Sequence, residues 1–125
     1  MSTPTIDYTT ATLEECLLDF QQRFNENARV KKLIPGWNRK ILIEPTDVEN
    51  PIHLVISDNE MREVSPGMVE DPMLVHMQAD EETFKRVWTG DINPATALID
   101  GTLAVFSDER DKVKLEAIAM VIWGL

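Results

Sequence analysis

The last nine residues of the chain, Ala117 to Leu125, contain no charged, hydroxyl or amide side chain. They end a stretch beginning at Val113 that is expected to form a helix. A helix on a protein surface needs only one apolar stripe, so a helix that is apolar all round must be buried on several sides or lie against a ligand. The tail is shorter than the roughly 20 residues that span a membrane, and we expect it to fold inside the protein.

Two short helices and a strand are predicted before this tail. Residues 80–90 have a capping Asp, acids in the first turn and a closing Gly, which are the start and stop signals of a helix. Residues 93–101 begin with an Asn cap and a Pro and end at Asp-Gly, which predicts a second helix. Residues 102–106 are strand-like, and a charged loop is expected between them and the last helix.

Four features of this half of the chain carry a family resemblance. They are Phe84, the run Gly90-Asp91-Ile92-Asn93-Pro94-Ala95-Thr96-Ala97, the turn into a strand at Gly101-Thr102-Leu103-Ala104-Val105, and Lys114-Leu115 at the expected start of the last helix. Their order resembles the C-terminal half of the sterol carrier protein 2 family, which are small lipid-binding domains. The resemblance extends over residues 74–118 and is only architectural before them. Thr102 stands where the family usually has Lys, and Ser107-Asp108 where Gly-Asp is common. The resemblance implies a lipid tunnel between helices and sheet.

The N-terminal half predicts two helices followed by strands. Thr12 and Glu15 make a capping box, and apolar residues recur behind them at helical spacing. A second helical piece is expected from Asn27 to Leu33, before the breaking sequence Ile34-Pro35-Gly36. The segments 37–45, 52–57, 61–64 and 73–79 then alternate as strands do.

These elements predict an α/β protein of the α+β type with a five-stranded mixed, mostly antiparallel sheet. Helices from both ends of the chain should cover one face. The other face should be partly wet, because Asn38, Lys40, His53 and Gln78 alternate onto it. We expect residues 12–125 to form a single sterol carrier protein 2-like domain behind a flexible N-terminus of residues 1–11.

Composition narrows the environment and the partners. A formal net charge of −10 repels nucleic-acid phosphates, so we expect no nucleic-acid partner. The single cysteine excludes an intrachain disulfide. Residues 1–11 lack the basic start and apolar run of a secretory signal, and we expect a soluble cytoplasmic protein.

Residues suited to catalysis are scarce. His53 and His76 lie in separate predicted strands, whereas a zinc site needs three or four clustered ligands. Cys16 falls on the apolar stripe of the first helix, where a thiol is inert. The acids at 80–82 are explained by the helix dipole, and no Gly-rich phosphate loop is present. We expect no catalytic residue, no metal and no cofactor, and a protein that is not an enzyme.

The apolar faces of the predicted helices must meet the apolar face of the sheet, and two arrangements are open. One is a plain close-packed core. The other is a ligand cavity, favoured by the apolar last helix and by the flexible side chains of Met73, Met77 and Met120, which suit an irregular site. The residues expected to line such a cavity are Phe20, Phe24, Ile43, Leu54, Met77, Phe84, Trp88, Leu103, Ile118 and Ile122.

Residues 29–40 interrupt the acidity of the chain. They hold five basic residues, no acidic residue and a Trp37 that we expect to be exposed. As a docking surface, this segment would meet anionic lipid headgroups or the phosphates of an acyl-coenzyme A. As an ordinary surface, it would be a solvated helix end and an edge strand. The basic residues are Arg29, Lys31, Lys32, Arg39 and Lys40.

Two functions from different classes follow. The first is non-enzymatic binding, and transfer, of a hydrophobic ligand such as a sterol, fatty acid, acyl-coenzyme A or isoprenoid-like lipid, with transient contact to a membrane surface. The second is an accessory module that presents a lipid-like substrate to a partner enzyme of lipid metabolism, and the partner of the chain is then such an enzyme or a second copy in a homodimer. In that case the apolar tail and Trp123 would pack on the enzyme. A third option, an enzyme using Asp or Glu in the cavity, has no residue that stands out.

Overall fold

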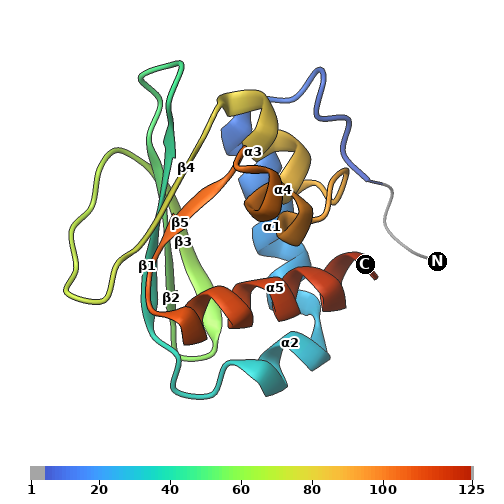
Figure 1. Cartoon of the computed structure of the whole chain (residues 1–125). Coiled ribbons are helices and arrows are strands. Elements are labelled where there is room, and N and C mark those ends of the chain that lie inside the picture. Colours follow the sequence, from blue (N-terminus) through green and yellow to red (C-terminus); the bar gives the residue numbers. More distant parts are fainter. Residues whose placement is uncertain (1–4, 125) are drawn as a thin grey trace.

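The computed structural model describes residues 5–124, and its helices form a layer on one face of a five-stranded sheet (Figure 1). In chain order the elements are α1 (Leu13–Glu26), α2 (Ala28–Leu33), β1 (Arg39–Pro45), β2 (Ile52–Ser57), β3 (Glu60–Pro66), β4 (Val75–Ala79), α3 (Glu81–Trp88), α4 (Pro94–Asp100), β5 (Ala104–Phe106) and α5 (Glu109–Trp123). Residues 1–4, which belong to the predicted flexible stretch 1–11, lie outside the described part of the chain. Leu125, at the other end, also lies outside it.

The strands lie in the order β3-β2-β1-β4-β5. β1 and β4 are parallel, with Ile43 opposite Met77, and every other neighbouring pair is antiparallel, as where Ile41 lies opposite Leu54. The mixed, mostly antiparallel sheet predicted from the sequence is therefore confirmed. The chain returns from the edge strand β3 to β4 through residues 67–74, which places β4 and β5 on the far side of β1.

Alternation along the strands separates the two faces of the sheet. Ile41, Ile43, Leu54 and Ile56 are buried toward the core shared with the helices. The opposite face carries Lys40, His53 and Gln78, all half-buried. All five helices lie on the same side of the sheet in Figure 1, so the prediction that helices from both ends of the chain cover one face is also confirmed.

The helices begin where their capping residues predict. The Thr12 hydroxyl accepts a hydrogen bond from the Glu15 N–H, and the Glu15 carboxylate accepts one from the Thr12 N–H, which completes the capping box of α1. Asp80 caps α3 by accepting from Thr83 N–H at 2.7 Å. Asn93 caps α4, with Pro94 at its first position. Behind its cap, α1 buries one apolar face formed by Leu13, Cys16, Leu17, Phe20 and Phe24.

Several element starts differ from the sequence prediction, and three of them have a clear local cause. α5 begins at Glu109, because Asp108 caps it and the acids of the supposed charged loop favour the positive end of the helix dipole. β4 begins at Val75, since the Asp71 carboxylate accepts from Met73 N–H at 2.9 Å and holds residues 71–74 in a turn. β5 begins at Ala104, because the Asp100 carboxylate accepts from Thr102 N–H at 3.0 Å.

A polar cluster fixes the N-terminal end of α5 to the start of β1. Asp111, in the first turn of α5, is buried, and its two carboxylate oxygens accept from Trp37 Nε1–H at 2.7 Å and from Arg39 Nε–H at 2.9 Å. One turn later, Lys114 Nζ donates to the Leu33 carbonyl at 2.8 Å. The expectation that Trp37 is exposed is wrong: its side chain is only 6% exposed, because Asp111 supplies the acceptor that lets the indole be buried.

We expect Asp111→Ala to lower the free energy of unfolding by about 2–4 kcal/mol, because it leaves a buried indole N–H and a half-buried guanidinium without their acceptor. Urea denaturation measures this change. The matched control is Glu109→Ala in the same turn, whose exposed ion pair with Lys112 at 3.7 Å should be worth no more than about 0.5 kcal/mol. Equal effects of the two substitutions would contradict the role assigned to the cluster.

Candidate functional site

An apolar cavity of ≈ 40 Å³ lies between the sheet and the helices. Every strand contributes to its wall, as do α1, α3, α4 and α5. Lys112 and Glu116, one turn apart on α5, are the charged residues among the lining, and the wall is otherwise apolar. The lining residues are Phe20, Phe24, Ile41, Ile56, Met61, Met77, Val87, Trp88, Pro94, Leu98, Leu103, Val105, Lys112, Leu115, Glu116, Ile118 and Ala119.

The structure brings six of the ten expected lining residues to this cavity: Phe20, Phe24, Met77, Trp88, Leu103 and Ile118. The other four lie outside its wall. Ile43, Leu54 and Phe84 are fully buried in the surrounding core, and Ile122 is partly buried against that core. Alternation places a residue on the helix side of a strand, but only the position at which α5 crosses the sheet decides whether that residue meets packed neighbours or free space.

Two of the three methionines expected at the site are elsewhere. Met73 is 51% exposed in the turn before β4, and Met120 is 54% exposed on the outer side of α5. Met61, which the sequence analysis did not single out, lines the cavity from β3. Leu115 was also missed, although it lies three residues before Ile118 and therefore on the same side of the helix. That spacing was the available signal.

Aromatic rings form one end of the wall. Phe20 meets Trp88 edge-to-face, with ring centroids 4.7 Å apart and planes at 83°, and lies 6.4 Å from the ring of Trp123. The edge-to-face pair contributes about 0.5–1.5 kcal/mol beyond its buried area. The indole Nε1 atoms of Trp88 and Trp123 are both buried and have no hydrogen-bond partner. A buried unsatisfied donor costs about 1–3 kcal/mol.

Trp123 fixes the C-terminal end of α5. Its ring lies against the backbone of Gly90 so closely that a Cβ at that position would be 2.5–2.9 Å from three ring atoms. The Arg23 guanidinium lies 4.8 Å from the ring centroid on the α1 side. In the accessory hypothesis Trp123 would pack on a partner enzyme, whereas in the structure this side chain packs within the chain, against the core.

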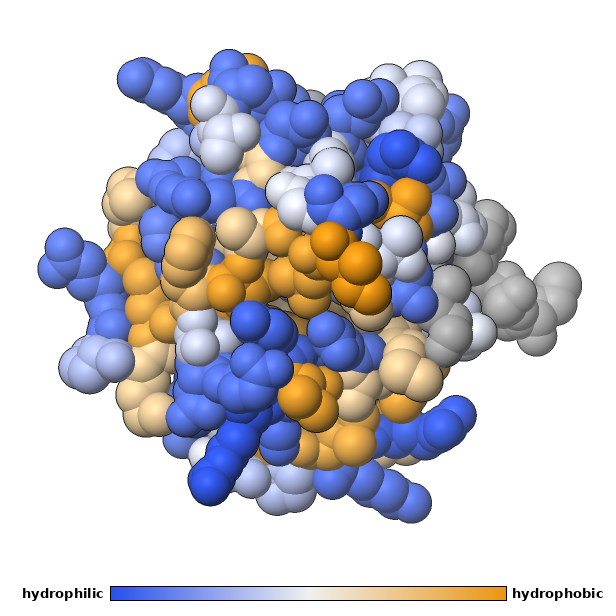
Figure 2. Space-filling model, viewed as in Figure 1, coloured by the Kyte–Doolittle hydropathy of each residue, from blue (hydrophilic) through white to orange (hydrophobic). Residues whose placement is uncertain are grey.

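An apolar surface surrounds the region of the cavity. Figure 2 shows a band of hydrophobic side chains across this face, over α4, β5 and α5, with a hollow near its centre. The exposed large apolar residues of these elements are Ile99, which is 87% exposed, and Phe106, Val113 and Met120. α5 makes its main contacts with α2 and α4 rather than with the sheet.

The residues considered for catalysis have ordinary structural surroundings. His76 Nε2 and Gln78 Nε2 lie 2.9 and 2.8 Å from the same Glu44 oxygen, and these hydrogen bonds, that of Gln78 first, lower the pKa of Glu44. His53 Nδ1 lies 2.9 Å from the Gly67 carbonyl. Both histidines lie on the sheet face opposite the helices, away from the cavity wall.

Within residues 5–124, no three His, Cys, Asp or Glu side chains are grouped so that they could hold a metal ion. None of the helices in this described part is long and apolar enough to cross a membrane.

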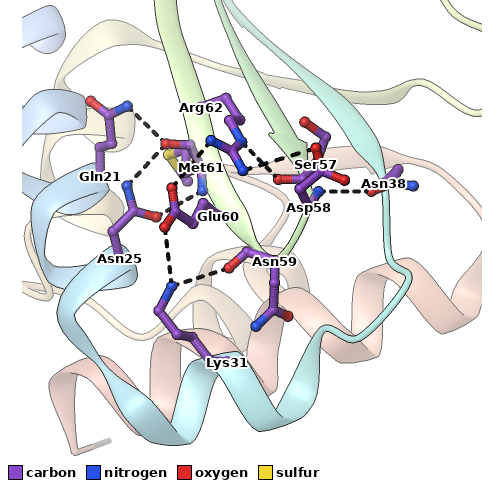
Figure 3. A network of polar contacts seen from close by, with 10 residues as sticks. All are labelled: Gln21, Asn25, Lys31, Asn38, Ser57, Asp58, Asn59, Glu60, Met61 and Arg62. Atoms are coloured by element: carbon purple, nitrogen blue, oxygen red, sulfur yellow. Dashed lines mark hydrogen bonds and ion pairs between the residues drawn. The ribbon is translucent and has the colours of Figure 1, made fainter.

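Three of the five basic residues proposed for docking are engaged by acids. Lys31 donates to the Asn59 carbonyl and pairs with Glu60 at 3.7 Å, within a network that ties the β2–β3 hairpin to α1 and α2 (Figure 3). Arg39 pairs with Asp111, and Lys40 lies 3.9 Å from Asp71. Arg29 and Lys32 are exposed.

The sequence matches no protein-family model. It also matches no curated protein. The structure, however, matches solved sterol carrier protein 2 domains over most of the chain. Palmitated SCP2L2 from Aedes aegypti aligns with a TM-score of 0.60 at 14% identity, covering 87% of this chain and 95% of that one. The UbiJ-SCP2 ubiquinone synthesis protein aligns with a TM-score of 0.62 at 12% identity, covering 88% and 94%.

An enzyme also contains this fold. The sec-alkylsulfatase Pisa1 from Pseudomonas sp. aligns with a TM-score of 0.58 at 15% identity. The match covers 73% of this chain and only 14% of the sulfatase chain. These likenesses confirm the sterol carrier protein 2 fold that the sequence motifs predicted, and at these identities they show the fold alone.

We expect Cys16 to resist alkylation in the folded protein. Burial raises the pKa of its thiol to about 11, so at pH 8 only about one molecule in a thousand carries the reactive thiolate. The test is iodoacetamide labelling at pH 8, followed by mass spectrometry. Cys16 should be modified in about 8 M urea, which unfolds most domains, and should stay unmodified without urea. Rapid labelling of the native protein would contradict the burial assigned to this residue.

Gly90→Ala should destabilise the protein more than Gly101→Ala, by about 1–3 kcal/mol, because only the first puts a methyl group into the Trp123 ring. The two glycines are matched: their φ angles are +78° and +83°, and nothing lies within 4 Å of a Cβ at Gly101. Urea denaturation of both variants gives the difference. Equal destabilisation would show that Trp123 does not rest on Gly90.

Proposed function

We propose that this protein binds a hydrophobic ligand, without catalysis, in the apolar cavity between its sheet and its helices, and that it transfers this ligand. The ligand class is a sterol, fatty acid, acyl-coenzyme A or isoprenoid-like lipid. The observation that carries the proposal is the cavity itself: its wall is apolar apart from Lys112 and Glu116, and it is built from the sheet and the helices, with α5 supplying five of the lining residues. The sterol carrier protein 2 fold, including that of the palmitated Aedes aegypti domain, supports the same function.

The cavity must expand to accept such a ligand. Its volume of ≈ 40 Å³ is near that of one or two water molecules, whereas pockets for drug-sized molecules occupy about 300–1,000 Å³. An elongated tunnel, as expected from the sequence, is therefore not open in this structure. Expansion requires one wall to move outward while the sheet stays intact.

α5 is the wall suited to that movement. It is the last helix described, its main contacts are with α2 and α4, and only Asp111, Ile118 and Ala119 of its residues are buried. Outward movement of its central turns separates Ile118 and Leu115 from the sheet without breaking a strand pair. The ligand then replaces the lost contacts, because each Å² of apolar surface removed from water contributes about 25 cal/mol.

The non-enzymatic character rests on the lining. Its charged groups are Lys112 and Glu116, one turn apart on α5, and no histidine, cysteine, serine or threonine lies beside them in the lining. General acid–base or nucleophilic chemistry requires a positioned group held against the substrate by further polar partners.

A second function has specific support from the comparisons. One neighbour is named as a ubiquinone synthesis protein, and another is an alkylsulfatase whose chain includes this fold as a small part. An accessory role, presenting a lipid-like substrate to a partner enzyme, fits these contexts. The exposed apolar residues Ile99, Phe106, Val113 and Met120 are the surface that such a partner would meet, in place of Trp123.

Native mass spectrometry of the protein purified from cells separates the two functions. A lipid that stays bound to a monomer and is released by organic extraction supports carriage. An empty chain that associates with itself, or with an enzyme, through α5 supports the accessory role.

We expect Ala119→Leu to weaken lipid binding roughly tenfold, the equivalent of about 1.4 kcal/mol, because the larger side chain occupies the cavity from its movable wall. Fluorescence titration with dehydroergosterol and with cis-parinaric acid measures the affinity. Ala117→Leu is the matched control, since Ala117 lies on the same helix but outside the lining. Unchanged binding by the Ala119 variant, with circular dichroism showing an intact fold, would place the ligand elsewhere.

The basic segment gives a further test of the proposed membrane contact. Because Lys31, Arg39 and Lys40 are paired with acids, Arg29 and Lys32 are the residues through which anionic headgroups would act. The double variant R29E/K32E should lose sedimentation with phosphatidylserine vesicles at low salt, since each basic residue near such a surface contributes about 1 kcal/mol. Sedimentation equal to that of the unmodified protein would show that this segment does not bind anionic membranes.

A further inference from the structure

The exposure of the lining residues shows which side of the cavity faces solvent. Most of the lining is buried, and every half-buried member comes from α4, β5 or α5. The hollow in Figure 2 lies over the same elements. The mouth of the cavity is therefore between α5 on one side and α4 with β5 on the other. The half-buried residues of this mouth are Pro94, Leu98, Val105, Lys112, Leu115 and Glu116.

Both charged residues of the lining belong to the mouth. The side chain of Lys112 is 29% exposed, and its Nζ atom lies 3.7 Å from a carboxylate oxygen of Glu109, whose side chain is 78% exposed. The ammonium group of Lys112 thus reaches solvent while the methylene stem borders the cavity. An ion pair as open to solvent as this one contributes little, so the carboxylate of a ligand can take the place of Glu109.

The inner part of the cavity carries no charged side chain. Its lining residues on α1, α3 and the strands β1 to β4 are apolar and buried, among them Phe20, Phe24 and Met61. A carboxylate taken to that end would lose its hydration without meeting a cation, whereas a hydrocarbon chain end is accommodated there without such a cost. The polar end of a ligand therefore stays at the mouth, and its chain extends toward α1.

The two charges at the mouth act on an anion in opposite directions. Lys112 attracts a carboxylate, and Glu116, one turn further along α5, repels it. An anionic headgroup is thus held at the Lys112 end of the mouth. The headgroup of an uncharged lipid, such as a methyl ester, responds much less to either residue.

Building on the proposed function, we propose that Lys112 is the headgroup-binding residue of the mouth and that the protein binds fatty acids with the hydrocarbon end innermost. The carboxylate of the fatty acid pairs with the Lys112 ammonium group in place of Glu109. Glu116 lowers the affinity for the same carboxylate. The chain passes between α5 and β5 and reaches Phe20 and Phe24 on α1.

The test compares two probes of equal chain length, tetradecanoate and its methyl ester, at about pH 8, where a carboxylic acid is ionised. Competition with methyl cis-parinarate, an uncharged fluorescent tracer, gives the affinity of each. Lys112→Met, which keeps an apolar stem, should lower the preference for the acid over the ester by about three- to fivefold. Glu116→Gln should raise that preference by about two- to threefold.

Arg110→Met is the matched control for these variants. Arg110 lies on the same helix and is exposed, and its removal changes the net charge by the same amount as Lys112→Met. Because Arg110 is outside the cavity lining, its variant should leave the preference for the acid unchanged. The opposite signs expected for Lys112→Met and Glu116→Gln separate a charge effect from a general loss of stability, which would act on both probes alike.

Spin-labelled stearic acids test the orientation without any substitution. The nitroxide of 5-doxyl-stearate is near the carboxyl group, and that of 16-doxyl-stearate is near the far end of the chain. With ¹⁵N-labelled protein, we expect the first to broaden the amide signals of Lys112 and Glu116 most strongly, and the second to broaden those of Phe20 and Phe24. The reverse pattern would show that the carboxyl group lies inside and would overturn the inference.

The outcomes separate this inference from the function on which it rests. If neither the acid nor the ester binds, the proposed function fails together with the inference. If both bind but Lys112→Met changes the preference no more than Arg110→Met does, hydrophobic binding stands and the assignment of Lys112 is wrong. A fall in preference for Glu116→Gln equal to that for Lys112→Met would also contradict the assignment.

Discussion

α5 is fixed to the rest of the molecule at its two ends, and the apolar cavity lies beneath the part between them. At one end, Asp111 joins Trp37 and Arg39 through both carboxylate oxygens. At the other, the Trp123 ring rests on the backbone of Gly90. The two attachments differ in kind: the first is a buried polar cluster, and the second is a close apolar contact. Together they hold a helix over the sheet without requiring its middle turns to fill the interior.

The size of the cavity follows from this arrangement. Apolar side chains from the helices and strands pack against one another and leave ≈ 40 Å³. Such close packing is expected, because an apolar void forfeits dispersion contacts along its whole lining. In the function proposed above, a lipid would supply those contacts from inside, and the side chains that now form core would become its binding surface.

Much of the fold could be predicted from the sequence because its signals are local. The caps at Thr12, Asp80 and Asn93 and the alternation in β1 and β2 depend only on neighbouring residues, and each gave the correct element. The wrong prediction for Trp37, by contrast, depends on a distant partner. Trp37 appeared exposed because its acceptor, Asp111, lies 74 positions further along the chain.

The site was predictable only in part, for a related reason. Periodicity selected the side of each strand and helix that faces the core, and six of the expected lining residues are in the wall. Ile43 and Phe84 follow the same periodicity, but their side chains are buried in the packed core instead of lining the cavity. The position at which α5 and α4 cross the sheet decides this, and that position depends on how the layers assemble. The flexibility of methionine suggested Met73 and Met120, yet a turn held by Asp71 and the outer side of α5 expose them.

The most direct measurement is a crystal structure of the protein grown with a long-chain lipid. We expect continuous density for the chain between Phe20 and Ile118, an outward shift of the central turns of α5, and a cavity of about 300 Å³ or more. Strand pairing should be unchanged. An interior packed as tightly as in the present structure, with the lipid absent or attached only to the outer surface, would contradict lipid binding in the cavity.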